Sequence, residues 1–485
     1  MANAIKLPDM GTNVEECTLQ SWRVKVGDPV KRGQVLAEIE TDKATAELES
    51  TAEGILLQQI AQPGQKVSTG EILAYVGQPG EVIEGTPAPP PKPSVRTPLP
   101  APAKAAVAVT PPTKVSARVS PVVRNLAEKM GVDLARVQGT GQGGTITRED
   151  VLRAGAQEKP QPPKAAQPET PEFLLSLYRQ MVLIRQFEER VKFLFLEGIM
   201  PGTIHQYQGQ EAVAVGVCSA LEARDVITST HRPHGHALAR GLTAESLLHE
   251  LFGKTTGCCR GKGGSMHVGD LEKGMAPAIA IVAGAIPMAT GFALAFKMKK
   301  EPRVAVCFMG DGAVNEGAFH EGVNLGAVFS LPVVYVIENN LYSASTPIFD
   351  MVRVKKLSDR AAAYGIPGVT IDGNDVLAVH ETARQAIERA RRGEGPTLIE
   401  CMTYRITGHS RRDPCNYQPE EERKQALEKE PIRRFASLLE SKGIADQAKL
   451  DSIRQEVDAE IERAVKSAMA APDPLPQDAL EDLFV

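Results

Sequence analysis

The stretch RVAVCFMGDGAVNEGAFHEGVNLGAVFSLPVVYVIENN (303–340) decides the fold of the larger part of this chain. It contains two apolar runs, RVAVCFM (303–309) and LPVVYVIE (331–338), which are typical of buried parallel strands. Helical stretches lie between such runs along the rest of this part. Strands that alternate with helices predict an α/β fold with a doubly wound parallel sheet.

Polar residues follow both runs, where each predicted strand ends. Asp311 follows the first run after a single glycine, and Asn339 and Asn340 follow the second. The carboxyl ends of parallel strands form the edge where open α/β sheets bind ligands. A lone Gly-Asp-Gly is a common turn, but its pairing with Asn-Asn after a second strand favours a magnesium site, because Mg²⁺ prefers oxygen ligands. We expect the metal ligands Asp311, Asn340 and the main-chain carbonyl of Tyr342, with Gly312 and Ala313 leaving room for a phosphate at a helix start.

The composition excludes several classes of protein. The 485 residues include 55 Lys and Arg against 60 Asp and Glu, and this acidic balance does not favour nucleic acid as a partner. The seven cysteines show no CxxC spacing, which argues against a zinc ribbon or a disulfide scaffold and for a reducing compartment. Without a long apolar run or a signal-like N-terminus, we expect no membrane segment and a cytoplasmic location.

Two proline-rich stretches divide the chain. Ten prolines fall within residues 81–117, and a shorter stretch of similar composition covers 156–171. Such segments cannot bury a core and are typical of extended linkers. The predicted folded segments are therefore 1–80, 118–155 and 172–485.

The first segment contains an internal repeat. Gly27, Val30, Gly33, Leu36 and Ala37 recur 37 residues later as Gly64, Val67, Gly70, Leu73 and Ala74. Short apolar runs punctuated by glycine predict strands, and two similar halves predict a small flattened β-barrel. Lys43 stands at a turn near the midpoint of the repeat.

A lysine at a hairpin tip is usually no more than a solvated side chain. Here it sits at the tip of a domain that is followed by a flexible tether, which suggests a carrier arm. Residues 3–80, centred on ETDKA (40–44), resemble the lipoyl domain of 2-oxo acid dehydrogenase complexes. A biotin carrier would read Met-Lys-Met at this point, whereas this chain reads Asp-Lys-Ala. The resemblance implies lipoate in amide linkage to Lys43.

The second segment, 118–155, is small, helical and locally basic. The simplest interpretation is a pair of helices within a linker that binds no partner. A nucleic-acid-binding module is not favoured, because the segment has no second basic stripe and no set of aromatic residues for stacking on bases. Within residues 118–153 stand SP (120–121), Arg124, LA (126–127), GVDL (131–134), GTG (139–141) and GG (143–144). On these residues the segment resembles the peripheral subunit-binding domain of the same complexes. The resemblance implies that this segment binds dihydrolipoyl dehydrogenase, the decarboxylating component or an acyltransferase core. Arg124 and Arg148 are the candidate contacts.

The third segment resembles the α subunit of the heterotetrameric 2-oxo acid dehydrogenases. The match rests on HQYQGQEA (205–212), STHRPHGH (229–236), GCCRGKGGSMH (257–267) and YRITGHSRRDP (404–414), together with the metal motif. The resemblance implies thiamine diphosphate with Mg²⁺, a 2-oxo acid substrate and an α₂β₂ assembly. In this family a Glu of the β subunit completes the site.

The same resemblance assigns further site residues. It implies that Arg232 and His409 bind the diphosphate end, that Val282 lies against the aminopyrimidine, and that His205 lines the active channel. His205 and His409 are thus the catalytic candidates. Two positions depart from the usual pattern, since His231 replaces a common Tyr and Ala280 a common Gly near the pyrimidine.

The substrate stays open between related enzymes. SRRDP (410–414) and LYSASTP (341–347) favour a pyruvate dehydrogenase, our first prediction. STHR (229–232) and DLEKGM (270–275) favour an acetoin dehydrogenase, and a branched-chain 2-oxo acid dehydrogenase is a further alternative. A different class of function is a non-catalytic subunit that only tethers partners.

Overall fold

The computed structural model describes residues 2–7, 16–40, 45–78, 81, 123, 145–147, 170–410 and 413–481. The chain divides into two compact units, one of residues 1–83 with 167–485 and the other of residues 84–166. Few residues of the second unit are described, so the predicted contacts Arg124 and Arg148 lie outside the described residues. Below, the N-terminal strands and the α/β part are each described by themselves.

The N-terminal part is built from strands alone within its described residues. Two four-stranded antiparallel sheets have the orders β1-β8-β6-β3 and β5-β4-β2-β7. Apolar side chains of both sheets, among them Leu19, Leu36 and Leu56, share one core. The strands are β1 (Asn3–Lys6), β2 (Glu16–Trp22), β3 (Pro29–Val30), β4 (Val35–Glu40), β5 (Thr45–Glu49), β6 (Gly54–Gln59), β7 (Lys66–Ser68) and β8 (Ile72–Gly77).

The sequence repeat is visible in the strand order. Advancing each strand number by four exchanges the members of the two sheets, as expected for two similar halves. Gly27 and its counterpart Gly64 both have positive φ, at 96° and 85°. The Gly27 N–H donates to the Leu56 carbonyl and the Gly64 N–H to that of Leu19, the equivalent bond in the other half. Lys43 falls between the paired strands β4 and β5 but lies outside the described residues.

The α/β part is organised around a five-stranded sheet in the order β14-β15-β11-β10-β9, with all neighbours parallel. The two apolar runs of the deciding stretch form its centre, and Gly310 at the end of the first lies opposite Glu338 of the second. The doubly wound parallel sheet predicted from the sequence is thus confirmed. The strands are β9 (Val226–Thr228), β10 (Ala305–Gly310), β11 (Val333–Asn339), β14 (Gly368–Asp372) and β15 (Thr397–Met402).

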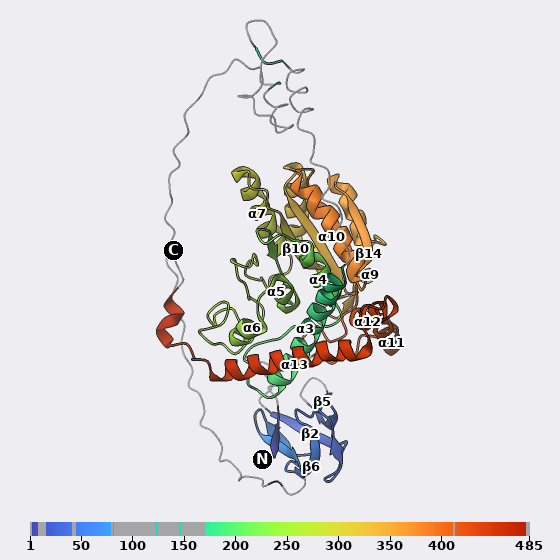
Figure 1. Ribbon diagram of the computed structural model, residues 1–485. Coiled ribbons are helices and arrows are strands. Elements are labelled where there is room, and N and C mark those ends of the chain that lie inside the picture. The colour runs from blue at the N-terminus through green and yellow to red at the C-terminus, as the bar shows by residue number, and fades with distance from the viewer. Residues whose placement is uncertain are drawn as a thin grey trace. The chain divides into compact units, whose positions relative to one another are not determined.

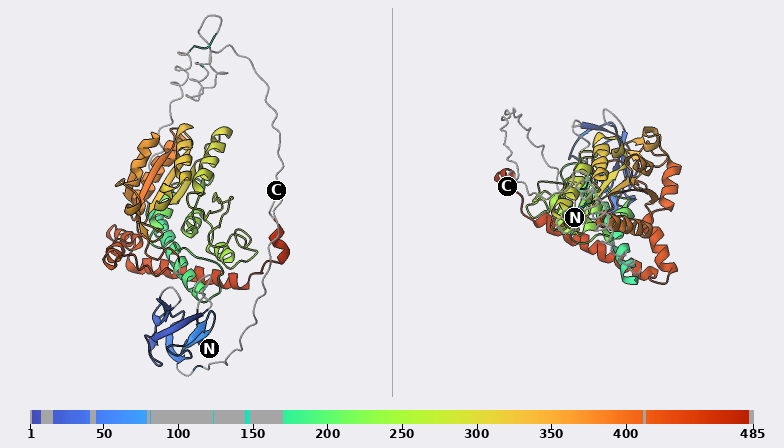
Figure 2. Two further views of the ribbon diagram at one scale, coloured as in Figure 1. Left: turned by 180° about the vertical axis from the view of Figure 1, so that it is seen from behind. Right: turned by 90° about the horizontal axis from the view of Figure 1, so that it is seen from above.

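Helices cover both faces of this sheet (Figures 1 and 2). Successive residues of a strand point to opposite faces, so Val306 and Phe308 join one core, whereas Cys307 and Met309 join the other. The first core includes side chains of α3 (Pro171–Leu196), α4 (Glu211–Ser219), α5 (His234–Arg240), α6 (Ala244–Leu251), α10 (Val376–Arg391), α12 (Pro431–Ser441) and α13 (Gln447–Ala470). The second includes α7 (Ala285–Lys299), α8 (Gly317–Val328), α9 (Ile348–Met351) and η3 (Leu357–Tyr364).

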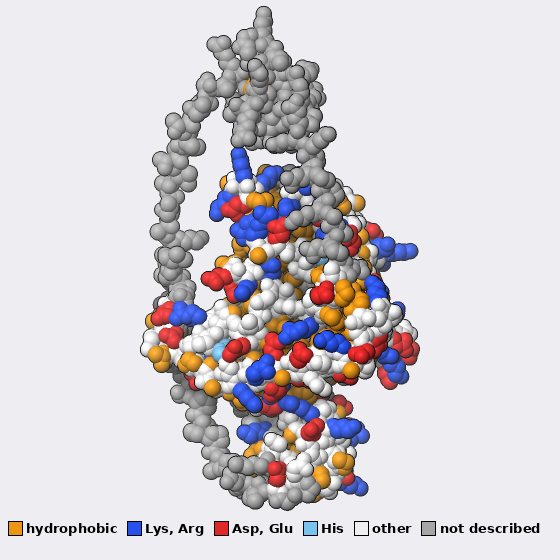
Figure 3. Space-filling model, in the orientation of Figure 1, with side chains coloured by type: hydrophobic (Ala, Val, Ile, Leu, Met, Phe, Trp, Pro, Cys, Tyr) orange, Lys and Arg blue, Asp and Glu red, His pale blue; other side chains and the backbone are white. Residues whose placement is uncertain are grey.

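Five further elements complete the order. A tight turn of helix, η2 (Asp311–Asn315), begins directly after β10, and the hairpin β12 (Tyr342–Ser343) and β13 (Thr346–Pro347) follows β11. The helix α11 (Glu420–Glu428) and the turn η4 (Pro476–Leu480) belong to the C-terminal region. No helix in the described part of the chain combines the length and apolar character that crossing a bilayer requires. On the face shown in Figure 3, basic and acidic side chains are interspersed.

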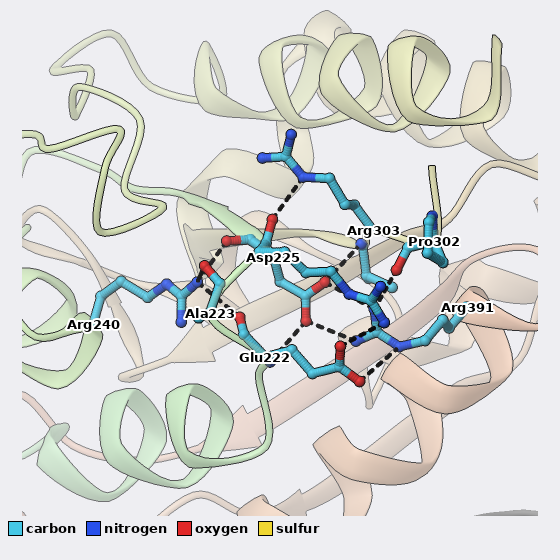
Figure 4. Close-up of polar contacts among 9 residues, drawn as sticks. Glu222, Ala223, Asp225, Arg240, Pro302, Arg303 and Arg391 are labelled. Atoms are coloured by element: carbon cyan, nitrogen blue, oxygen red, sulfur yellow. Dashed lines mark hydrogen bonds and ion pairs between the residues drawn. The ribbon is translucent and has the colours of Figure 1, made fainter. Parts of the chain in front are cut away.

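A buried ion pair holds the amino-terminal edge of the sheet together (Figure 4). Asp225, which has no solvent-exposed surface, precedes β9. Its carboxylate accepts hydrogen bonds from the backbone N–H groups of Glu222 and Val304, both at 2.9 Å, and from the two terminal nitrogens of Arg391 at 3.0 and 2.7 Å. Arg391 also donates to the Pro302 carbonyl at 2.7 Å, so α10 is tied to the starts of β9 and β10.

We expect Arg391→Met to destabilise the α/β part by about 3–5 kcal/mol, because the carboxylate of Asp225 stays buried without its charged partner. Urea denaturation followed by far-UV circular dichroism measures the change. The neighbouring Arg392 forms a more exposed pair with Glu394, so Arg392→Met is a matched control that should cost less than about 1 kcal/mol. Equal losses in the two variants would contradict the structural role of the buried pair.

Candidate active site

A cleft of about 180 Å³ opens at the carboxyl ends of β10 and β11. The strand ends contribute Asp311 and Asn340 to its wall, as the sequence predicts for a ligand site. Of the predicted site residues, those that line the cleft are His231, Arg232, Val282, Asp311, Gly312, Ala313, Asn340, Tyr342 and His409. Ala280 is half-buried and is not among the lining residues, and His205 lies behind His231 and His409.

The buried carboxylate of Asp311 is only partly hydrogen-bonded within the described residues. The side chain is 2% exposed, and its Oδ1 accepts a hydrogen bond from the Gly312 N–H at 2.7 Å. The other oxygen, Oδ2, is buried and has no hydrogen-bond partner among the described residues. Burial raises the pKa of this carboxyl to about 6, against the opposing effects of the Gly312 N–H, the Arg405 charge and the nearby backbone N–H groups of Asn340 and Leu341. A buried carboxylate oxygen without a donor is suited to a cation.

The neighbouring oxygens complete a donor set of the kind that Mg²⁺ prefers. The Asn340 amide donates from Nδ2 to Gln210 Oε1 at 2.8 Å, which leaves its Oδ1 on the side of the Tyr342 backbone N–H at 3.3 Å. The Tyr342 carbonyl lies 3.4 Å from the Arg405 guanidinium. One carboxylate, one amide oxygen and one carbonyl therefore fit a hard divalent ion with room for phosphate oxygens and water.

Two buried arginines make the cleft suitable for an anion. Arg232 is 4% exposed and donates to the main-chain carbonyls of Gln206 and His409, the latter at 3.1 Å. Arg405 is 1% exposed and donates to the Ala344 carbonyl at 2.6 Å and to the Tyr417 hydroxyl at 2.7 Å. These partners are neutral groups, so both guanidinium charges remain available to a ligand with phosphate groups.

Three histidines meet beside the arginines. The centre of the His205 ring lies 4.7 Å from the centre of the His231 ring and 4.8 Å from that of the His409 ring. Burial and then the Arg232 charge lower the pKa of His205 and of His409 to about 4, and that of His231 to about 2. All three rings are therefore neutral at pH 7. The His205 Nδ1 lies 2.7 Å from the His409 carbonyl, which fixes the Nδ1–H tautomer and leaves Nε2 as the acceptor.

A buried network supports the floor of the cleft from the side of the sheet. Glu338, at the end of β11, accepts hydrogen bonds from Tyr207 and from His236 Nε2, the latter at 3.1 Å. The other ring nitrogen of His236 contacts Ser229 Oγ at 2.8 Å. Segments 205–212, 229–236 and 338–340, which are far apart in the sequence, are thus joined behind the cleft.

An apolar wall faces the polar groups. Ile281 and Val282 are 73% and 51% exposed at the mouth, although aliphatic side chains are usually buried. This exposure supports the expectation that Val282 contacts an apolar part of a ligand.

The sequence analysis missed Arg405 and Gln210. Arg405 lies in the stretch YRITGHSRRDP (404–414), in which only His409 was predicted to bind the diphosphate end. Nothing in the local pattern shows that Arg405 would be buried or that Gln210 would orient Asn340 across 130 residues. Both depend on tertiary contacts.

The lowered pKa of His409 predicts a pH effect on stability. Between about 4 in the folded chain and 6.5 in the unfolded chain, the unfolded state binds more protons, so stability falls as the pH drops through this window. His409→Gln removes one such group, and we expect a shallower loss between pH 6.5 and 4. Urea denaturation at several pH values measures both slopes, and identical slopes would contradict the assignment.

Comparisons with known proteins agree with this site. A family model described as dehydrogenase E1 component matches residues 179–477. A model described as biotin-requiring enzyme, which covers biotin and lipoyl domains, matches residues 3–76, and an e3 binding domain matches residues 117–152. These matches support thiamine diphosphate and covalently bound lipoate as cofactors, and the oxygen donors described above suit the accompanying Mg²⁺.

Curated relatives align with the third segment. The α subunit of acetoin:2,6-dichlorophenolindophenol oxidoreductase from Bacillus subtilis is 50% identical over 317 residues, which are 65% of this chain and 95% of the relative. Its counterpart from Cupriavidus necator is 45% identical over 66% of this chain and 97% of the relative. The chloroplastic pyruvate dehydrogenase E1 component subunit alpha-3 from Arabidopsis thaliana is 41% identical over 64% and 74%, respectively. The chain therefore belongs to the dehydrogenase E1 component family, as an α subunit of thiamine-dependent 2-oxo acid dehydrogenase complexes that also carries a lipoyl domain and an E3-binding domain.

Proposed function

We propose that this chain, together with a β subunit, transfers an acetyl unit derived from pyruvate to a lipoyl group on its own Lys43. The observation that carries the proposal is the buried Oδ2 of Asp311, which has no hydrogen-bond partner in the described part of the chain, in a cleft on the same chain as a lipoyl domain. The first feature suits a metal-bound diphosphate, and the second provides the acceptor.

We assign the cleft residues by their chemistry. Asp311, Asn340 and the Tyr342 carbonyl hold Mg²⁺, and the Gly312 and Ala313 backbone approaches the diphosphate. Arg232, with His409 beside it, neutralises the diphosphate charge. Val282 contacts the pyrimidine, near Ala280, and His231 packs against the other two imidazoles.

His205 and His409 are the proposed proton carriers of the reaction. Thiamine diphosphate supplies a carbon nucleophile and a sink for the electrons that the substrate releases. Because both imidazoles are neutral at pH 7, each can accept a proton at a ring nitrogen. The His205 Nδ1–H is committed to the His409 carbonyl, so Nε2 is the atom that receives it.

The lipoyl arm accounts for the fused domains. We propose that residues 1–80 and 118–155 fold separately and are joined to the catalytic segment 172–485 by the linkers 81–117 and 156–171. A tethered acceptor has a high effective concentration at the site, which favours acylation within the same complex. Arg124 and Arg148 are the proposed contacts of the second segment with dihydrolipoyl dehydrogenase or an acyltransferase core.

Acetoin is the second candidate substrate. The relatives that are 50% and 45% identical carry acetoin in their names, whereas those named pyruvate dehydrogenase reach 41%. Pyruvate stays first because SRRDP (410–414) and LYSASTP (341–347) are similar to pyruvate-type enzymes. Cleavage of either substrate can leave an acetyl unit on the arm, so the acceptor chemistry is the same.

The mass of the peptide that contains Lys43 tests the function. The lipoylated chain is incubated with its β subunit, Mg²⁺, thiamine diphosphate and, in parallel, pyruvate, acetoin or a branched 2-oxo acid. We expect an acetyl mass increase with pyruvate. An increase with acetoin alone would favour the second candidate, and lipoylated Lys43 that no substrate acylates would favour a tethering role.

Asp311→Asn tests the metal assignment. In the presence of the β subunit, we expect the Mg²⁺-dependent affinity for thiamine diphosphate to fall more than about tenfold, because the amide cannot provide the charge of the carboxylate. Isothermal titration calorimetry measures the affinity. The exposed Asp350 offers a matched control, and Asp350→Asn should bind as the parent chain does.

A second measurement separates lost binding from lost folding. Without cofactor, Asp311→Asn should unfold at a higher temperature than the parent chain, since it removes a buried charge whose Oδ2 lacks a hydrogen-bond partner among the residues that the structure describes. Unchanged affinity together with unchanged stability would contradict the role of Asp311.

A further inference from the structure

A buried carboxylate shapes the glycine-rich loop GCCRGKGG (257–264). Glu250, near the end of α6, has no solvent-exposed surface. Its carboxylate accepts hydrogen bonds from backbone N–H groups of the loop, all between 2.7 and 3.0 Å, at Cys259, Gly261, Gly263 and Gly264. The conformation of this loop therefore depends on N–H groups that point inward to one side chain.

Two adjacent cysteines lie at this carboxylate. The Sγ atoms of Cys258 and Cys259 and a carboxylate oxygen of Glu250 are all within 4.8 Å of one another. Both thiols are half-buried, so small reagents can reach them. The thiol of Cys258 donates to Cys259, and this hydrogen bond lowers the pKa of Cys259.

The other cysteines of the α/β part offer no comparable pair. Cys218, Cys307, Cys401 and Cys415 are buried, and burial raises the pKa of Cys218 and of Cys307 to about 12. A thiolate is the reactive form of cysteine, so Cys259 is favoured over these thiols as a nucleophile.

Hydrogen bonds link the residue after the loop to a segment next to the cleft. Ser265, which follows the loop directly, has its Oγ 3.0 Å from His234 Nε2, and His234 Nδ1 lies 3.0 Å from Glu188 Oε1. His234 is only two residues from Arg232, whose guanidinium lines the cleft. A movement of the loop would therefore reach a cofactor-facing segment.

We propose that Cys258 and Cys259 form a redox site, in which oxidation joins the two thiols as a disulfide and releases the loop from Glu250. With a low-molecular-weight disulfide as oxidant, the Cys259 thiolate attacks one sulfur and expels the first small thiol. The Cys258 thiol then loses its proton, attacks the mixed disulfide and expels the second. The pair loses two electrons, and the oxidant gains two electrons and two protons as two thiols.

Geometry explains why this disulfide would act as a switch. Adjacent Cα atoms are about 3.8 Å apart across a trans peptide, below the usual range of about 4.4–6.8 Å for a disulfide. The bond is therefore strained and readily reduced again, which is typical of regulatory disulfides. Closing it rotates the peptide whose N–H donates from Cys259 to Glu250, so the hydrogen bond at 2.8 Å is lost.

Mass spectrometry of the full chain tests the redox step. The chain is equilibrated in glutathione buffers of increasing oxidised fraction, trapped with an alkylating reagent and digested. We expect the peptide that contains both cysteines to lose two hydrogen atoms and to become unreactive toward the trap. Cys258→Ser is the matched control and should stop at a mixed disulfide of Cys259 with glutathione. A parent peptide that remains a dithiol or a mixed disulfide in every buffer would overturn the proposal.

Hydrogen exchange tests the release of the loop in the same samples. Oxidation should speed exchange of the Cys259 and Gly261 amides by at least about tenfold, because their bonds to Glu250 open. The Cys258→Ser chain should show no such change in any buffer. A disulfide that leaves amide exchange unchanged would also overturn the proposal. Neither measurement needs substrate or the β subunit, so their outcome is independent of the proposed acetyl transfer.

Discussion

The α/β part depends on the parallel register of β10 and β11, which places two strand ends side by side at one edge of the sheet. Gly310 lies opposite Glu338, so the residues that follow, Asp311 and Asn340, meet at the same cleft. The strands before them are buried on both faces, and this leaves the strand ends as the natural place for polar chemistry. One oxygen of the buried Asp311 carboxylate has no hydrogen-bond partner among the described residues, which makes this position suitable for a cation.

Three buried carboxylates differ in how many of their oxygens are hydrogen-bonded, and this difference distinguishes structural residues from a candidate binding residue. Asp225 and Glu250 are each surrounded by donors, and each holds chain segments together, at the start of the sheet and in the glycine-rich loop. Asp311 is equally buried but keeps one oxygen without a partner among the described residues. A buried carboxylate with both oxygens hydrogen-bonded, as in Asp225 and Glu250, stabilises the fold. The Asp311 oxygen without a partner is instead suited to binding a ligand.

Local patterns predicted the fold well, and they placed Asp311 and Asn340 together at the edge where β10 and β11 end. The apolar runs gave the central strands, and the repeat around Gly27 and Gly64 gave the two similar halves of the N-terminal part. Arg405 and Gln210 could not be predicted, because only tertiary packing buries the first and brings the second to Asn340. The hydrogen bonds from the glycine-rich loop to Glu250 could not be predicted for the same reason, because a glutamate in a helix is usually exposed to solvent. The roles of Lys43, Arg124 and Arg148 remain predictions, as they lie outside the described residues.

The proposed acylation of the chain's own lipoyl domain would change what limits the reaction. When carrier and enzyme are separate chains, the acceptor must be captured from solution, and surface electrostatics sets that rate. A tethered acceptor is already present at high effective concentration, so specific docking contacts add little. Selection for substrate can then rest with the cleft, where two buried arginines and three neutral histidines are held by main-chain carbonyls and by one another.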